Sequence, residues 1–267
     1  MRFASLTAVV LPLLAACPGG NTGSKRGYPA PTAADIVARL EKDHGTRTAC
    51  TAESTMAYWL GKDRVKGTVL VMGTIGKKVR FNALSPAGGT VLADMACDGT
   101  NFAYVDQQNN CQLTGPCDRQ SIASLLHLEV EPEDFIFFAV GSVPVMGSTG
   151  TVTWDPTSGH EKVALTGPKG TQTIELDMRG GRFDVIASKL EDGGKTVWSI
   201  ENADFGNVSD PSGAEHRLPG KTRFKAPNQA ADLLVDWGER TVNPDLSNAA
   251  KFQVTVPAGL ATCGSRS

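Results

Sequence analysis

Residues 78–97 read KVRFNALSPAGGTVLADMAC, two apolar segments joined by a short turn sequence. In the first segment Val79 and Phe81 alternate with the charged residues Lys78 and Arg80, which is typical of a strand with one buried and one solvent-exposed face. The Pro and the two Gly residues between the segments favour a turn. The stretch therefore predicts an antiparallel hairpin.

Similar apolar segments lie on both sides of this hairpin. They extend from Thr51–Leu60 to Lys251–Val256, and Gly, Pro, Asp or Asn residues bound them. The turns Arg179-Gly180-Gly181 and Asp192-Gly193-Gly194 match short antiparallel connections. We predict a mainly β fold in which one domain, residues 31–260, contains a strongly curved antiparallel sheet of about ten or eleven strands.

Three helices are expected around this sheet. The first follows Thr32, whose side chain can cap it with Asp35 as the capping-box partner. Two more are expected over Asp118–Leu128 and Pro132–Gly141, between two blocks of strands. The last of these is apolar over most of its surface, and such a helix has to be buried. We therefore expect it inside the curve of the sheet.

Composition and motifs exclude several classes of function. The chain has 267 residues and a formal net charge of −2, and its longest basic run is Lys77-Lys78, so a nucleic-acid partner is not expected. The four histidines do not form a metal-binding or catalytic pattern, and phosphate-binding and dinucleotide-binding fingerprints are absent. We predict a protein that is not an enzyme and that needs no cofactor or metal.

The N-terminus has the features of an export signal. Arg2 precedes an apolar run that is too short to span a bilayer, and the run ends in Leu14-Ala15-Ala16-Cys17. These four residues resemble a bacterial lipobox, which implies a signal peptide of residues 1–16 and acyl chains such as palmitate on Cys17. The alternative is a plain secretory signal in which this Cys is accidental.

Residues 17–30 are rich in Gly and polar residues, so we expect the lipidated Cys17 to be followed by a flexible tether. Position 18 is Pro rather than the Asp that resembles an inner-membrane retention signal. This favours a lipid-anchored protein of the outer membrane, on its periplasmic or external face. Which of the two faces it occupies, and its oligomeric state, stay open.

Five further cysteines follow Cys17. In an oxidising compartment they are expected to pair, and because their number is odd at least one stays free or pairs between molecules. Cys111 and Cys117 bracket a short loop and are the first choice for a disulfide.

Several stretches of apolar and turn residues follow one another in a recognisable order: Val79–Leu92, Asp98–Asp106, Ile122–Leu126, Phe135–Pro144 and Phe252–Gly259. They resemble the LolA/LolB family of lipoprotein carriers and acceptors, and specifically its outer-membrane LolB-type members. The resemblance implies an incomplete antiparallel barrel with an N-terminal helix and a central helical lid. It also implies a LolB-like function, in which acyl chains of lipids or lipoproteins bind in the concave apolar hollow.

Six apolar side chains are candidates for lining such a hollow, although each can equally be plain core: Val79, Phe81, Val91, Phe102, Phe135 and Phe138. The loop with Pro86, Ala87 and Gly88 corresponds to the membrane-facing loop of LolB-type members, which has an exposed Leu where this chain has Ala87. The shorter side chain forfeits about 2 kcal/mol of burial, at about 0.8 kcal/mol per methylene.

The shortened side chain at position 87 and the several cysteines favour an alternative function. In this second hypothesis the half-barrel is a structural or assembly lipoprotein of the outer membrane, and it serves as a scaffold that binds a partner. Its hollow would then be filled by its own side chains.

Overall fold

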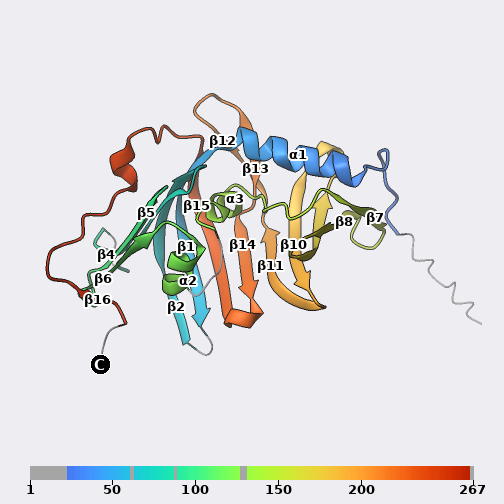
Figure 1. Ribbon diagram of the computed structural model, residues 1–267. Coiled ribbons are helices and arrows are strands. Elements are labelled where there is room, and N and C mark those ends of the chain that lie inside the picture. Colours follow the sequence, from blue (N-terminus) through green and yellow to red (C-terminus); the bar gives the residue numbers. More distant parts are fainter. Residues whose placement is uncertain (1–22, 61–62, 87–88, 127–130, 265–267) are drawn as a thin grey trace, which may run out of the picture.

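One large, open sheet dominates the computed structural model, which describes residues 23–60, 63–86, 89–126 and 131–264 (Figure 1). The helices are α1 (Ala33–Thr46), α2 (Arg119–Leu126) and α3 (Asp134–Ala139), with short 3₁₀ turns η1 (Arg179–Gly181), η2 (Pro227–Gln229) and η3 (Ala249–Phe252). The strands are β1 (Ala49–Leu60), β2 (Asp63–Thr74), β3 (Lys78–Leu84), β4 (Val91–Asp98), β5 (Asn101–Asp106), β6 (Cys111–Pro116), β7 (Thr149–Asp155), β8 (His160–Gly167), β9 (Gly170–Asp177), β10 (Asp184–Asp192), β11 (Lys195–Ala203), β12 (Gly206–Ser209), β13 (Glu215–Leu218), β14 (Lys221–Ala226), β15 (Ala231–Val242) and β16 (Ala261–Thr262).

The main sheet has 14 strands in the order β16-β6-β5-β4-β3-β2-β1-β15-β14-β11-β10-β9-β8-β7, and β12 and β13 form a separate pair. Neighbouring strands are antiparallel except β16 and β6, which are parallel. The sheet curves without closing, so the predicted incomplete barrel is confirmed, with more strands than the expected ten or eleven.

The hairpin predicted from residues 78–97 is formed by β3 and β4. Val79 pairs with Cys97 and Phe81 with Met95, and the side chains of Val79, Met95 and Cys97 are at most 2 % exposed. The alternation predicted from the sequence therefore places one face of the hairpin in the core. A register shift between Ala83 and Leu84 interrupts this alternation near the turn.

Helix α1 forms as its sequence predicts. The side-chain oxygen of Thr32 accepts a hydrogen bond from the backbone N–H of Asp35, and the carboxylate of Asp35 accepts one from the backbone N–H of Thr32. These two bonds satisfy donors that a helix N-terminus otherwise leaves free. The buried stripe of α1 packs on β7 and β8 and consists of Ala33, Ile36, Val37 and Leu40.

Helix α3 lies inside the curve of the sheet, as expected, and packs on β1 and β2. Gly73 in β2 makes this close approach possible, because a Cβ atom at this position would overlap the Cδ1 atom of Ile136. Helix α3 ends at Ala139, and Gly141, just beyond its C-cap, adopts a positive φ of 70°. Within the described residues, no helix is long and apolar enough to cross a membrane.

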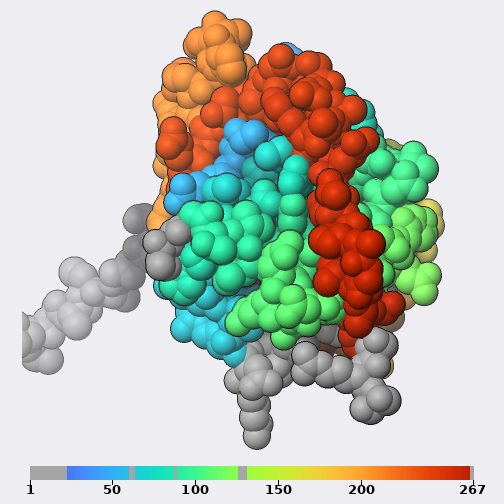
Figure 2. Space-filling model, turned by 90° about the vertical axis from the view of Figure 1, so that its left-hand side faces the viewer, coloured from blue at the N-terminus to red at the C-terminus, as the bar shows by residue number. Residues whose placement is uncertain are grey.

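The C-terminal segment differs from its predicted structure. The stretch expected as a strand, Lys251–Val256, begins with the end of η3 and continues without regular structure. Phe252 is 2 % exposed, and Arg80 donates a hydrogen bond to the carbonyl oxygen of Lys251, so this segment is held by packing on β3 and β4. Figure 2 shows it as a red band across one face of the molecule.

The predicted disulfide between Cys111 and Cys117 is wrong. Cys111 begins β6 and Cys117 follows its last residue, so a strand of six residues, about 20 Å long, holds the two apart. The structure pairs Cys97 with Cys117 and Cys111 with Cys263, with Cα–Cα distances of 5.4 and 4.9 Å. Cys50 is a buried free cysteine, and burial raises the pKa of its thiol to about 12.

Part of the stretch predicted as a tether, residues 17–30, contacts the sheet. Its residues 17–22 lie outside the described part of the chain, but the backbone N–H of Ser24 donates to the carbonyl oxygen of Pro156 at 2.8 Å. Arg26 forms two hydrogen bonds with Glu161 in β8. The segment from residue 24 onward is therefore held on the sheet.

Candidate functional site

The structure divides the six predicted cavity residues into three groups. Val79 and Phe102 are at most 2 % exposed and belong to the core around β3–β5, and they do not line the hollow under α3. Phe81, Phe135 and Phe138 meet in the hollow under α3. Val91 is 37 % exposed at the first position of β4, because the register shift beside Leu84 breaks the alternation that the prediction assumed.

The hollow directly under α3 is filled. Phe135 contacts Phe81 edge-on at a centroid distance of 4.9 Å, and Phe138 lies 5.5 Å from Phe224. The cavity left between these rings and β15 has a volume of about 20 Å³. This is room for about one water molecule, far below the roughly 300 Å³ at which ligand sites begin.

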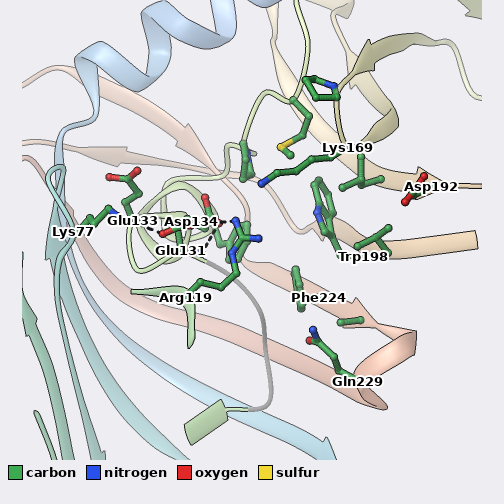
Figure 3. Close-up of a pocket in the computed structure, with 17 residues that line it drawn as sticks. Lys77, Arg119, Glu131, Glu133, Asp134, Lys169, Asp192, Trp198, Phe224 and Gln229 are labelled. Carbon is green, nitrogen blue, oxygen red and sulfur yellow. Dashed lines mark hydrogen bonds and ion pairs between the residues drawn. The ribbon is translucent and has the colours of Figure 1, made fainter. Parts of the chain in front are cut away.

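A larger space, the cleft, opens beside α3 on the concave face of the sheet (Figure 3). Its volume is about 690 Å³, which lies in the range of small-molecule sites. The cleft has an apolar floor formed by Phe138, Met146, Leu190, Val197, Trp198 and Phe224. An apolar floor of this kind can bind hydrocarbon.

Charged side chains from the β2–β3 turn and from the segments around α2 and α3 border one side of the cleft: Lys77, Arg119, Glu131, Glu133 and Asp134 (Figure 3). The opposite border comes from the turns that follow β8, β10 and β14, where Lys169, Asp192 and Gln229 lie. Phe138 and Phe224 line both the cleft and the 20 Å³ cavity, so their rings form the wall between the two spaces.

Two arginines hold the C-terminal end of α3 in place. Arg240 donates to the carbonyl oxygen of Ala139 and Arg47 to that of Val140, each at 3.1 Å. These carbonyl groups belong to a helix end, where intrahelical partners are missing. Burial lowers the pKa of both arginines.

His44 of α1 supports the same end of the lid. Its ring stacks on Phe137 at a centroid distance of 4.2 Å, and its Nε2 atom lies 2.6 Å from the hydroxyl oxygen of Ser142. Burial lowers the pKa of His44. Helix α3 is thus a lid that is fixed from α1, from Arg47 at the end of α1, and from β15.

A buried glutamine holds the segment that follows the lid. Gln172 in β9 is fully buried, and its side-chain amide donates to the carbonyl oxygen of Pro144 at 2.7 Å. Its side-chain oxygen accepts from the backbone N–H of Met146 at 2.8 Å. These two bonds place Met146 over the floor of the cleft.

The N-terminal end of α3 has an acidic group in an unusual environment. Burial raises the pKa of Asp134 to about 6, with further contributions from the charges of Glu131 and Glu133. The backbone N–H of Glu131 donates to the carboxylate of Asp134 and partly offsets this effect. The carboxylate is therefore partly protonated near pH 6.

The variant Asp134→Asn is expected to be more stable than the wild type above pH 6 and about equally stable near pH 4. An aspartate in the unfolded chain titrates near 3.9. Between this value and the raised pKa the folded state binds more protons, so wild-type stability falls as the pH rises from about 4 to about 6. The effect is worth up to roughly 3 kcal/mol.

Denaturant unfolding of both proteins between pH 4 and pH 8 measures this difference. The neighbouring Glu133→Gln is the control, since it removes one negative charge without neutralising Asp134. Stability curves of Asp134→Asn and the wild type that run parallel over the whole range would contradict the assignment.

Sequence reasoning did not single out the floor residues on β10, β11 and β14. Leu190 pairs with Trp198, and Ile200 pairs with Phe224, so these residues share one face of the sheet across three strands. Trp198 and Ile200 are two residues apart in β11, and this spacing indicates that both side chains lie on one apolar face of the strand. The described residues contain no group of three or more His, Cys, Asp or Glu side chains that could hold a metal ion.

Comparison with known proteins gives no sequence relative and a clear fold. No family model matches the chain, and no curated protein matches it. A LolA superfamily protein from Nitrosomonas europaea has a similar structure, with a TM-score of 0.53, 9 % identity and coverage of 84 % of this chain and 99 % of that one. A DUF1329 family protein from Desulfovibrio piger gives a TM-score of 0.50 at 12 % identity, covering 83 % and 98 % of the two chains. The open sheet with its N-terminal helix and internal lid is therefore a fold that this chain shares with proteins of the LolA superfamily.

Proposed function

We propose that this chain is a lipid-anchored envelope protein that binds the acyl chains of lipids or lipoproteins in the cleft beside α3, as a LolB-type acceptor or carrier. The observation that carries the proposal is the cleft itself, about 690 Å³ with an apolar floor on the concave face of a LolA-like fold. Burial of hydrocarbon on this floor supplies the binding energy, at about 0.8 kcal/mol per methylene. Binding of this kind involves no catalytic step.

The proposed location is the outer membrane, with acyl chains on Cys17 as the anchor. The support comes from the lipobox-like residues Leu14–Cys17 and from the two disulfides, which are typical of oxidising compartments. More than one acyl chain makes such an anchor stable.

One observation favours the second candidate, a scaffold that binds a partner protein. The space under α3, where an acyl chain would be most fully enclosed, has a volume of about 20 Å³ and is packed with aromatic rings. A scaffold needs no interior space. The two functions differ in whether hydrocarbon enters the cleft.

Binding of a fluorescent fatty acid to the purified protein decides between them. We expect saturable binding in the cleft, and native mass spectrometry after gentle extraction should show bound lipid. Trp198→Ala removes an aromatic part of the floor and is expected to weaken binding about tenfold, which corresponds to ~1.4 kcal/mol.

The matched control is Trp59→Ala. Trp59 is also a half-buried tryptophan on a strand, but it packs against Arg64 and Arg223 and does not line the cleft. It should leave fatty-acid binding unchanged. A wild-type protein that neither binds the fatty acid nor retains lipid would overturn the carrier function in favour of the scaffold.

A further inference from the structure

The segment that follows the proposed lipid anchor is fastened to one end of the sheet. Glu161, the second residue of β8, is fully buried, and both of its carboxylate oxygens accept hydrogen bonds from Arg26, at 2.6 and 2.9 Å. Bidentate pairing of this kind fixes the geometry of both partners. We call the contact between Arg26 and Glu161 the latch.

Aromatic and backbone contacts surround the latch. Trp154 donates its indole N–H to the carbonyl oxygen of Ser24 at 2.8 Å, and the guanidinium of Arg26 lies 5.4 Å from the centre of the Trp154 ring. Tyr28 meets the same ring edge-on at 6.2 Å. Three residues of the N-terminal segment are thus held by β7 and β8.

The latch leaves a short connection to Cys17. Seven residue steps separate Cys17 from Ser24, which span at most about 25 Å when fully extended and about 15 Å as a flexible coil. Without the latch and the contacts of Ser24 and Tyr28 around it, the first fixed residue would be Thr32 at the start of α1, and the extended reach would double to about 50 Å. The latch therefore determines which end of the domain stays near the anchor.

One border of the cleft lies at the opposite end of the sheet. Strand β8 begins at His160, next to the latch, and ends at Gly167, and the next two residues, Pro168 and Lys169, border the cleft. A strand of eight residues is about 26 Å long. The turn after β14, which contains Gln229, lies at this same far end.

The latch end presents several basic side chains at its surface. Lys25 and Arg39 are exposed, and Arg179 and Arg182 share a single carboxylate partner, Asp177. Arg39 and Arg182 border one surface depression together with η1. Asp43, Asp184 and Glu215 line the same depression, so this end carries charges of both signs. Its exposed Lys25 and Arg39 can contact anionic lipid headgroups.

From these observations we infer that the end of the domain formed by the β7–β8 turn, η1 and the latch is its membrane-facing surface, and that it rests on anionic lipid headgroups. The cleft then opens away from the membrane in which the protein is anchored. Ligands reach it from the aqueous side, and Pro86, which follows β3, lies at the end of that strand that faces away from the membrane. The inference rests on the lipid anchor of the proposed function.

The orientation can be measured on the mature, acylated protein in vesicles of phosphatidylcholine and phosphatidylglycerol. A fluorophore is attached at Thr157→Cys in the β7–β8 turn or at Asn228→Cys in η2, both exposed positions. Energy transfer to labelled lipid headgroups should be several-fold higher from the first position than from the second. Equal transfer, or higher transfer from position 228, would overturn the inference.

Two variants test whether the latch causes the orientation. The double variant Arg26→Gln, Glu161→Gln should remove the difference between the two positions, whereas Lys162→Gln, which breaks a neighbouring ion pair with Asp155, should preserve it. If the double variant does not fold, ten Gly and Ser residues inserted between Thr22 and Gly23 lengthen the tether with the latch intact. This insertion should reduce the difference as well, and an unchanged difference in the folded variants would show that the latch has no such role.

The same preparation separates this inference from the proposed function. Intact mass reports the acyl chains on Cys17, and their absence would remove both the anchor and the orientation. An acylated protein that is oriented as expected but binds no fatty acid would contradict the carrier function alone. An acylated protein that binds fatty acid but shows no preferred orientation would contradict the inference alone.

Discussion

Cys263→Ser is expected to lower the free energy of unfolding by about 4–5 kcal/mol, because the bond it removes closes the longest loop in the chain's disulfide pattern. Cys111 and Cys263 are 152 residues apart in sequence. In the chain-entropy description, a crosslink stabilises the folded state by restricting the unfolded chain, and the effect grows with loop length. For a domain of this size the midpoint of thermal unfolding should fall by about 10 °C or more.

The second disulfide provides the matched control. Cys97 and Cys117 are 20 residues apart, and the same description assigns their loop about 3 kcal/mol. Thermal and denaturant unfolding of the two double Cys→Ser variants measures both contributions without leaving a free thiol. A smaller loss for the Cys111–Cys263 pair than for the Cys97–Cys117 pair would contradict the expected order.

The long-range disulfide also protects the edge of the sheet. It holds β16 against β6, where the backbone N–H of Cys263 donates to the carbonyl oxygen of Gln112 at 3.0 Å. Without the bond, the polar backbone groups of β6 become available to other chains. The variant that lacks this disulfide should therefore aggregate at lower concentrations than the variant that lacks the other.

Local features of the fold were readable from the sequence. The alternation of apolar and charged residues and the turn residues between the segments predicted the hairpin at residues 78–97. The capping residues and the apolar stripe predicted α1. Both elements depend on residues that are close in sequence, so the local sequence pattern is sufficient to predict them. The burial of α3 followed from the same kind of reasoning, since an apolar helix between strands has to be covered.

Features that depend on distant residues were missed. The pairing of Cys111 with Cys263 and the latch between Arg26 and Glu161 join positions 152 and 135 residues apart. Nothing near Arg26 indicates that its partner is a buried glutamate in β8. The cleft floor shows the same limit, because Trp198 and Phe224 become neighbours of Phe138 through the order of strands in the sheet and not through any local pattern.

Phe138→Ala is expected to have opposite effects on stability and on ligand binding. Phe138 is 7 % exposed, and its truncation should lower the free energy of unfolding by about 3–5 kcal/mol. Its ring also separates the cleft from the small cavity under α3, so truncation joins the two spaces. Longer acyl chains should then bind more tightly, by about 0.8 kcal/mol for each additional methylene that becomes buried.

Phe102→Ala is the matched control for Phe138→Ala. Phe102 is 2 % exposed in the same core, and it lines neither the cleft nor the small cavity. The two variants should lose similar stability, but in titrations with fatty acids of 8 to 16 carbons the dependence on chain length should steepen in Phe138→Ala alone. If both variants and the wild type show the same dependence, hydrocarbon does not reach the wall between the two spaces. The rings under α3 would then be plain core, and the filled hollow would favour the scaffold over the carrier.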